Sequence, residues 1–381
     1  MQANQDQLTQ AKIAAEAQNK FAMELLKLEA AESPGKNVFI SPTSIFLALA
    51  MTEGGAAGKT RAAMRHTLAI PDSTTDDALA ASAAALSAQL HTRRNVELSI
   101  ANALWSDNSF PFAPAFVKKS RELYGADVTN LDFTKANATA DAINNWVRSK
   151  TKEKIPTIVT PDIIAKAKAV LTNTIYFQGA WRDKFKKELT TPGTFTMTRG
   201  HSKEVPFMHQ SHLRGAYRPG SGFEAAVLPY MNSGIAMCAL LPSPGKTPEQ
   251  ALAKVSIDKL MSFDSDELEI KLPRFTTEFS TKLKSPLTRM GMGIAFQYPG
   301  AEFTPLGSPL FYIGEVLHKA KLEVDEEGTV AASATAVMTM VGSAAPQKVE
   351  KRLLVFDRPF AVLLCDGATN AILFAGIINE P

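Results

Sequence analysis

The sequence is short of cysteine, of long apolar runs and of net charge, and each shortage excludes a class of protein. Cys238 and Cys365 are the two cysteines in 381 residues, and both lie in apolar runs typical of buried strands. We therefore expect buried free thiols, with a disulfide between them as the alternative. No apolar run approaches the roughly 18 residues of a membrane-spanning helix, so no membrane partner is expected. The net charge of +3, from 41 basic and 38 acidic residues, is too small and too evenly spread to favour nucleic-acid binding.

The amino terminus also lacks the usual marks of a signal peptide. "MQANQDQLTQAKIAAEAQ" has no basic region followed by a hydrophobic stretch. Two alternatives stay open at this point. Either the protein is cytoplasmic, or a signal peptide was removed before this numbering begins.

Common catalytic motifs are missing as well. "EGGAAGKT" (53–60) resembles a phosphate-binding loop, but Glu53 stands where that motif requires glycine. Neither G-x-S-x-G nor H-E-x-x-H occurs. His209 and His212 are spaced to touch one metal ion, yet no third ligand lies nearby in the sequence, so a surface pair is the better interpretation. We expect neither an enzyme nor a protein with a cofactor or metal.

The patterns that are present indicate helices early in the chain and strands late. Helical spacing of apolar residues predicts helices at 8–31, 74–90 and 138–155, the last of them stopped by Pro156. Long apolar runs predict strands at 96–105, 167–177, 222–230, 234–242, 268–275, 318–326, 352–365 and 370–380. This segregation, without an obvious linker, favours an α+β fold with large antiparallel or mixed sheets in one domain.

Several stretches, in order from about residue 19 to the end of the chain, together resemble the serpin family. They are "NVFISPTSIFLALAMTEGGAAGKT" (37–60), "INNWVRSKTKEKI" (143–155), "VLTNTIYFQGAWRDKF" (170–185), "VPFMHQ" (205–210), "LPRFTTEFSTKLKSPLTRMGM" (272–292), "HKAKLEVDEEGT" (318–329), "FDRPFAVLL" (356–364) and "ILFAGIINEP" (372–381). Each match is moderate alone, and jointly they are very specific.

The resemblance implies a single domain over residues 1–381, with three β-sheets, about nine helices and an exposed reactive-centre loop at about 327–350. It also implies an inhibitor that acts as a suicide substrate, with a target serine protease as covalent partner. The native protein is expected to be a monomer that can form loop-sheet polymers. Because protease targets are mostly outside cells, we expect a secreted or periplasmic protein whose signal was removed, with the cytoplasm as the alternative. A noninhibitory serpin that acts as a binding, chaperone or storage protein is the alternative function.

"DEEGTVAASATAVMTMVGSAAP" (325–346) fits a loop that must later become a central strand. After Glu327 it carries no charged side chain, and its residues are small. In a strand, Thr329, Ala331, Ser333 and Thr335 would lie on one face and Val330, Ala332, Ala334 and Ala336 on the other, so both faces would be small. An ordinary linker would usually contain more Gly, Pro or charge. The resemblance assigns the hinge to Glu326, Glu327, Gly328, Thr329, Val330, Ala331, Ala332, Ser333 and Ala334.

The family's spacing, about seventeen residues from Glu326, sets the bond that a protease would cut between Gly342 and Ser343. A hinge one residue shorter moves it between Val341 and Gly342. No Lys or Arg lies between Lys321 and Lys348, so a trypsin-like protease has no side chain to grip. Small apolar residues favour elastase-like or subtilisin-like targets, and Met340 keeps a chymotrypsin-like target open.

Two further groups follow from positions within the matching motifs. Ser41, Ser44, Asn173 and His318 correspond to the family's shutter, a polar cluster under the strands that must separate. Their hydroxyl, amide and imidazole groups can exchange hydrogen bonds during opening, although a static network is the alternative. Trp181, Arg274 and Glu326 correspond to the breach, where insertion begins, and Arg274 is expected to pair with Glu326.

Overall fold

The computed structural model describes residues 2–198, 200–214, 216–262, 267–307, 310–329 and 352–381. These residues form three β-sheets and ten α-helices, which confirms the expected α+β fold with three sheets and about nine helices. The helices are α1 (Gln2–Glu32), α2 (Pro42–Glu53), α3 (Gly58–Thr67), α4 (Asp76–His91), α5 (Pro114–Tyr124), α6 (Ala136–Lys150), α7 (Pro161–Lys166), α8 (Pro248–Leu252), α9 (Ile257–Met261) and α10 (Lys284–Leu287). Shorter helical turns are η1 (Lys187–Leu189), η2 (Thr288–Met292), η3 (Gly293–Phe296) and η4 (Thr304–Leu306).

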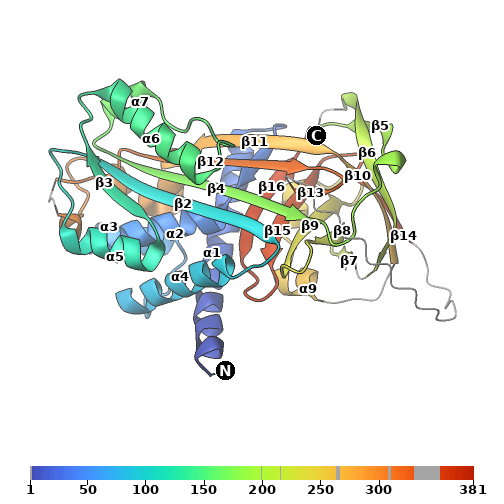
Figure 1. Cartoon of the computed structure of the whole chain (residues 1–381), viewed down its shortest axis with the longest axis horizontal. Coiled ribbons are helices and arrows are strands. Elements are labelled where there is room, and N and C mark those ends of the chain that lie inside the picture. The colour runs from blue at the N-terminus through green and yellow to red at the C-terminus, as the bar shows by residue number, and fades with distance from the viewer. Residues whose placement is uncertain (1, 199, 215, 263–266, 308–309, 330–351) are drawn as a thin grey trace.

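The main sheet has six strands in the order β11-β12-β13-β4-β2-β3 (Figure 1). Alternate side chains of its central strands are buried on opposite faces. Leu104 and Leu171 join the large core, whereas Trp105 and Val170 pack with the residues of α6 on the other face. Because both faces are covered, these strands read as nearly continuous apolar runs. The strands are β2 (Val96–Asp107), β3 (Asp127–Leu131), β4 (Ala169–Ala180), β11 (Phe275–Lys282), β12 (Glu315–Val324) and β13 (Gly328–Thr329).

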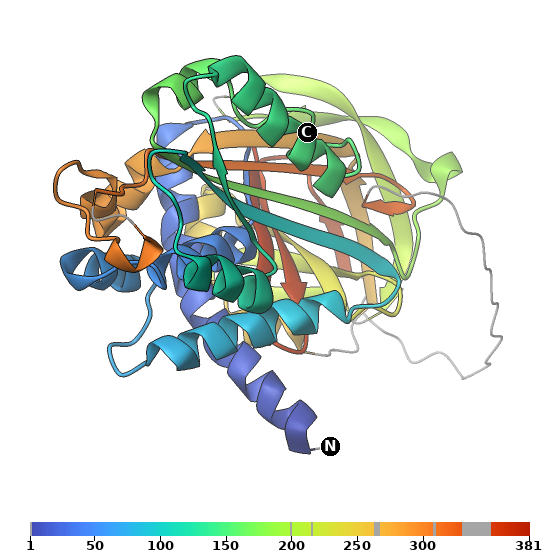
Figure 2. The ribbon, with the colours of Figure 1, turned by 60° about the vertical axis from the view of Figure 1, so that its left-hand side comes forward.

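A second six-stranded sheet forms the centre of the large core, in the order β1-β16-β15-β9-β8-β7. Figure 2 shows α1, in dark blue, and this sheet on the opposite side of the main sheet from α6. Cys238 on β9 and Cys365 on β15 are both buried and both free thiols, as expected. The strands are β1 (Val38–Ile40), β7 (Tyr217–Gly220), β8 (Phe223–Pro229), β9 (Ile235–Pro242), β15 (Phe360–Asp366) and β16 (Ile372–Ile378).

The third sheet has four strands in the order β14-β10-β6-β5. They are β5 (Thr191–Thr196), β6 (Ser202–Arg214), β10 (Glu267–Pro273) and β14 (Arg352–Val355). The chain enters β5 directly after the end of β4 and the turn η1. The β4–β5 connection therefore lies where the main sheet meets the third sheet.

Three expected elements have different limits in the structure. The helix expected at 138–155 ends at Lys150, because Lys152 and Glu153 take positive φ angles of 49° and 62° and turn the chain before Pro156 is reached. The strand expected at 268–275 is divided at Arg274 between β10 and β11, which belong to different sheets. The strand expected at 352–365 is likewise divided, around Pro359, into β14 and β15.

Candidate functional site

The main sheet is split at one end, and a short strand fills the split. Strands β4 and β12 pair in parallel over six residues, from Val170 with Glu315 to Ile175 with Ala320. Beyond this ladder they separate, and β13 lies between them, antiparallel to both (Figure 1). The first residues after the β12 turn are thus already part of the sheet.

A tight turn over residues 325–328 reverses the chain from β12 into β13. The Asp325 amide donates to the Gly328 carbonyl at 3.0 Å, and the Asp325 carboxylate accepts from the amides of Glu327 and Gly328 at 2.9 and 3.1 Å. A Cβ atom on Gly328 would lie 2.1 Å from the carbonyl oxygen of Gly179 on β4. Glycine is required here because no side chain fits between the two backbones.

Thr329 is the last described hinge residue, and its side chain is fully buried. It faces the core, where its hydroxyl is 2.6 Å from the hydroxyl of Tyr230 at the end of β8. The sequence did not indicate Tyr230, because the contact depends on the packing of the second sheet under the main sheet. The other predicted hinge residues, 330–334, and the residues predicted around the reactive bond, 340–343, lie outside the described residues.

The residues expected at the breach do lie together beside this turn. The Trp181 indole stacks on Tyr230 with ring centroids 4.6 Å apart, and its Nε1 donates to the Asp325 carbonyl at 2.9 Å. Arg274 approaches Glu326 at 3.7 Å between Nη1 and Oε1. The same Glu326 oxygen accepts a shorter hydrogen bond, 2.8 Å, from the Thr190 hydroxyl, which the sequence did not indicate. Glu326 is buried and is thus held by a hydroxyl as well as by a guanidinium.

The four residues expected at the shutter also lie together, at the centre of the sheet. The Asn173 amide on β4 donates to the Ser44 hydroxyl and to the Asn102 side chain on β2. Ser41 caps α2 by accepting from the Ser44 amide at 3.3 Å, and its hydroxyl donates to the Leu373 carbonyl on β16 at 2.7 Å. Asn102 was missed, although an amide inside the apolar run "SIANALW" was a signal for it.

His318 on β12 completes this network across the boundary between β4 and β12. The Ser41 amide donates to His318 Nε2 at 3.1 Å, so Nδ1 carries the proton and donates to Asn173 Oδ1 at 2.6 Å. Complete burial lowers the pKa of His318 from its ordinary value of 6.5 to about 3. The imidazole is therefore neutral at pH 7. Its bond to Asn173 must break if the two strands part.

Outside this region the described residues show little that could serve a catalytic or metal function. His209 and His212 each face a glutamate of β10, Glu269 at 2.9 Å and Glu267 at 3.7 Å. Among the described residues no group of three possible ligands is placed to hold a metal ion. None of the described helices combines the length and apolar character needed to cross a membrane.

Comparisons with known proteins agree with this geometry. The model of the family described as "Serpin (serine protease inhibitor)" matches residues 16–381. The leukocyte elastase inhibitor of Homo sapiens is 32% identical over 96% of this chain and 98% of its own length. Serpin B6 of Pongo abelii is 33% identical, over 97% of this chain and 100% of its own. Human thyroxine-binding globulin superposes with a TM-score of 0.86 at 25% identity, over 98% of this chain and 99% of its own.

None of these names supports the expectation of a secreted protein.

The family description names inhibitors, which confirms the expectation that the chain is not an enzyme. The match covers nearly the whole chain, and it agrees with three sheets and with the short strand β13 between β4 and β12. The chain belongs to the serpin family of serine protease inhibitors.

Proposed function

We propose that this protein inhibits serine endopeptidases as a suicide substrate by inserting its cleaved loop into the main sheet. The observation that carries the proposal is β13, whose two residues already pair with β4 and whose Thr329 also pairs with Val324 of β12. Residues 330–341 follow directly and are uncharged, and those up to Ala336 would present small side chains on both faces of a strand. They would continue β13 by displacing the six-residue ladder between β4 and β12.

The chemistry of the trap belongs to the protease. Its serine oxygen attacks the carbonyl carbon of the loop bond, the amide C–N bond breaks, and the amine end of the carboxyl-terminal piece leaves with a proton. An ester then joins the protease to the loop. We assign the bond to Gly342–Ser343, with Val341–Gly342 as the alternative. Insertion before hydrolysis of the ester drags the protease away and distorts its active site.

Insertion must supply enough free energy to hold a protease in a distorted state. About ten additional backbone hydrogen bonds at about 1 kcal/mol net each, together with apolar burial, supply on the order of 10 kcal/mol or more. The uncleaved protein is then a kinetic trap, a monomer whose sheet could also accept the loop of a second molecule. The hydrogen bonds among Ser41, Ser44, Asn173 and His318 would be exchanged as the strands part, and Trp181, Arg274 and Glu326 would guide the first step.

The target class follows from the residues on either side of the proposed bond. Val341, Gly342 and Ser343 are small or of medium size and uncharged, and the loop carries no basic residue before Lys348. Elastase-like and subtilisin-like proteases accept such residues, and Met340 would suit a chymotrypsin-like protease. The name of the leukocyte elastase inhibitor supports the first of these.

The proposal is tested by mixing the protein with an elastase and, separately, with a subtilisin. We expect an SDS-resistant adduct with the summed mass of protease and amino-terminal fragment. Mass spectrometry should find a released peptide that begins at Ser343 or Gly342. Cleavage at that bond with no adduct, and with all protease activity retained, would refute inhibition by trapping.

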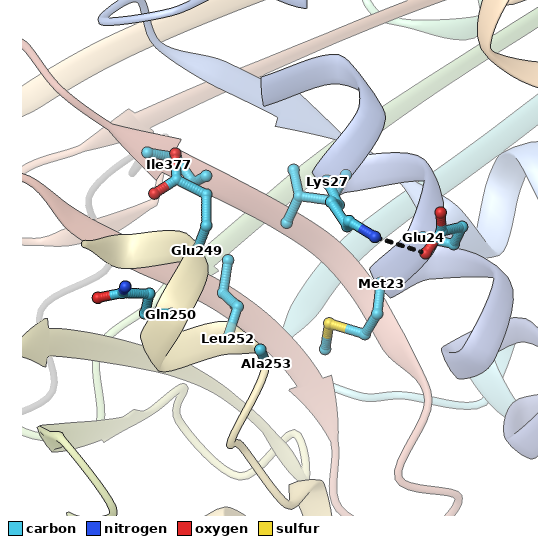
Figure 3. A pocket seen from close by; sticks show the side chains of 9 residues that line it. Met23, Glu24, Lys27, Glu249, Gln250, Leu252, Ala253 and Ile377 are labelled. Atoms are coloured by element: carbon cyan, nitrogen blue, oxygen red, sulfur yellow. Dashed lines mark ion pairs between the residues drawn. The ribbon is translucent and has the colours of Figure 1, made fainter. Parts of the chain in front are cut away.

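A cavity between α1 and α8 supports a second candidate, a carrier of a small amphipathic molecule. Its volume is about 430 Å³, and its apolar lining includes Met23, Leu252 and Ile377 (Figure 3). This volume lies within the usual range of ligand sites. Glu24 and Lys27 pair at 3.6 Å beside it. Thyroxine-binding globulin, a solved relative at 25% identity, forms a complex with thyroxine.

Thyroxine and the apolar dye anilinonaphthalene sulfonate are suitable probes for this candidate. Saturable binding that is lost in Ala253→Trp, which would fill the cavity from its exposed side, would support the carrier. Equal binding by Ala253→Trp, or none by the wild type, would exclude it. Binding to the cavity would leave the protease assay unaffected, so the two candidates are tested separately.

A further inference from the structure

The turn that carries the hinge is bound by residues 181–187 of the β4–β5 connection, of which the sequence indicated only Trp181. Three consecutive carbonyls of the turn, those of Asp325, Glu326 and Glu327, each accept a hydrogen bond from the start of the β4–β5 connection. The donors are Trp181 Nε1 at 2.9 Å, the Phe185 amide at 3.0 Å and the Trp181 amide at 2.9 Å. Residues 325–327 are therefore held along their whole backbone from one side.

Two lysines of the same connection bind the side chain of Glu327. Lys184 Nζ is 2.6 Å from Glu327 Oε2, and Lys187 Nζ is 3.5 Å from Oε1. The hydrogen bond from Lys184 is the main cause of a lowered pKa of Glu327. The Lys184 and Glu327 side chains are 32% and 28% exposed, so the pair is less accessible to water than a typical surface ion pair. The β4–β5 connection is thus bound to the hinge by the Lys184–Glu327 ion pair as well as by hydrogen bonds to the backbone of the turn.

Glu327 differs in this respect from its neighbour Glu326. Glu326 points inward, is buried, and is bound by Thr190 and Arg274. Glu327 lies further out, and no step described above gives it a task. Its two ammonium partners belong to the connection that follows Ala180, the β4 residue that pairs with Gly328 of β13.

We propose that Lys184, Lys187 and Glu327 form a clasp that holds the 325–328 turn closed over the split and so sets the rate at which the cleaved loop begins to insert. The proposal rests on the insertion mechanism given above and names positioning residues for it. The physical reason is the cost of starting a strand. The first residues to pair lose chain entropy for few hydrogen bonds, whereas each later residue adds bonds to an existing edge.

With the clasp closed, the turn and the three residue pairs of β13, two with β4 and one with β12, are already formed as a nucleus, and insertion has only to lengthen β13. With the clasp open, the turn and β13 would have to form again after cleavage. Loss of the clasp should therefore delay insertion and give the ester more time to hydrolyse. The result would be more cleaved, inactive inhibitor for each protease that is trapped.

The first test uses uncleaved protein and needs no protease. The variants are Glu327→Gln, which removes the charge and keeps the shape, and Lys184→Gln, which removes the charge and leaves a polar side chain one atom shorter. Lys203→Gln is the matched control, because Lys203 pairs with Glu380 at 3.0 Å on the third sheet, outside the hinge. Hydrogen exchange of the amides of residues 325–329 should be faster in both clasp variants than in the wild type and Lys203→Gln. Equal exchange in all four proteins would overturn the clasp.

The second test measures insertion alone. A metalloprotease that cuts the loop forms no acyl-enzyme, so insertion can be followed by the fluorescence of Trp181, which contacts the turn. Since partly buried, charge-assisted bonds are broken, we expect insertion to be roughly threefold to tenfold slower in both clasp variants. The double variant Lys184→Glu with Glu327→Lys restores opposite charges and should recover part of the rate. Unchanged or faster insertion in the single variants, or no recovery in the double variant, would contradict the proposal.

These readouts separate the clasp from the inhibitory function. If the wild type forms no covalent adduct with any protease but exchange and insertion change as stated, the inhibitory function fails and the clasp stands. If the wild type traps an elastase and the clasp variants trap it with the same stoichiometry and the same insertion rate, the clasp fails and the inhibitory function stands.

Discussion

At the scale of single residues, His318 shows how the environment of one side chain ties stability to pH. Its folded-state pKa of about 3 lies below the ordinary 6.5 because the imidazole is buried. The unfolded chain therefore binds a proton more readily between these values, and His318 reduces native stability as pH falls from 6.5 towards 3.

We expect the loss of stability that His318 causes at acid pH to disappear when the imidazole is removed. The difference in stability between the wild type and His318→Asn should change by up to about 1.4 kcal/mol per pH unit within that window. It should be constant above pH 7. Urea midpoints measured at half-unit steps of pH give this difference, and a difference that is independent of pH between 4 and 6 would contradict the assignment of a neutral imidazole.

Glu29 affects native stability in the opposite direction, because its contribution is lost as pH rises. It is buried at the end of α1, where both carboxylate oxygens lie 3.1–3.2 Å from the Thr281 hydroxyl on β11. Burial is the main cause that raises its pKa from 4.5 to about 7. The folded state holds the proton more tightly, so the contribution of Glu29 is most favourable below pH 4.5 and is lost as pH rises through 7.

Glu29→Gln keeps a group that can bond to Thr281 but carries no charge. It should stabilise the protein at pH 8 by about 2–3 kcal/mol and have much less effect at pH 4.5. The measurement is again the urea midpoint, here at pH 4.5, 6 and 8. A variant less stable than the wild type at pH 8 would show that the ionised carboxylate is well accommodated.

At the scale of elements, the sequence allowed the long strands to be predicted but not their membership of sheets. β10 and β11 are continuous in pattern, yet Arg274 between them donates its amide to Pro206 of the third sheet while β11 pairs with β12. Side chains alternate with a period of two in every sheet. The sequence pattern therefore does not show that the chain passes from the third sheet to the main sheet at Arg274. β5, β6 and β7 were missed because prolines and polar residues interrupt their patterns. β13, with two residues, is too short to have a pattern.

The candidate site was predictable to the extent that its residues stand in recognisable motifs. Ser41, Ser44, Asn173 and His318 were identified in this way, and the structure brings them together. Asn102 was not identified, because it joins them through the register of β2 against β4, which places it opposite Asn173. No role was expected for Lys184, which lies within the matching stretch 170–185. Its pairing with Glu327 depends on how closely the β4–β5 connection approaches the hinge.

The hinge strand makes a prediction at this same scale. Thr329 is fully buried against Tyr230, so Thr329→Arg would place an unpaired guanidinium in the core at a cost of at least several kcal/mol. We expect β13 to leave the sheet and the variant to become a substrate, cut at the same bond but forming no adduct. Thr329→Ser, which keeps the hydroxyl, is the control and should trap normally. Trapping of elastase at near one-to-one stoichiometry by Thr329→Arg would mean that this residue need not enter the core.

At the scale of the whole molecule, the main sheet has one place where a further length of strand can be added. The main sheet has six strands, but β13 occupies only the first two positions of the gap between β4 and β12. A full-length strand there would replace the six-residue ladder between β4 and β12 by two ladders, one with each neighbour, and would cover more of the core. If residues 330–341 complete this strand after cleavage, the cleaved protein gains hydrogen bonds and apolar burial that the uncleaved protein does not have. It should therefore be the more stable form.

The melting temperature before and after loop cleavage measures this directly. The protein is cut between residues 330 and 351 by a metalloprotease, with the two fragments remaining associated, and both forms are melted under the same conditions. If about 10 kcal/mol is gained at roughly 1 °C per kcal/mol for a chain of 381 residues, the cleaved form should melt at least about 10 °C higher. An unchanged or lower melting temperature after cleavage would show that the loop does not enter the sheet, and inhibition by insertion would be refuted.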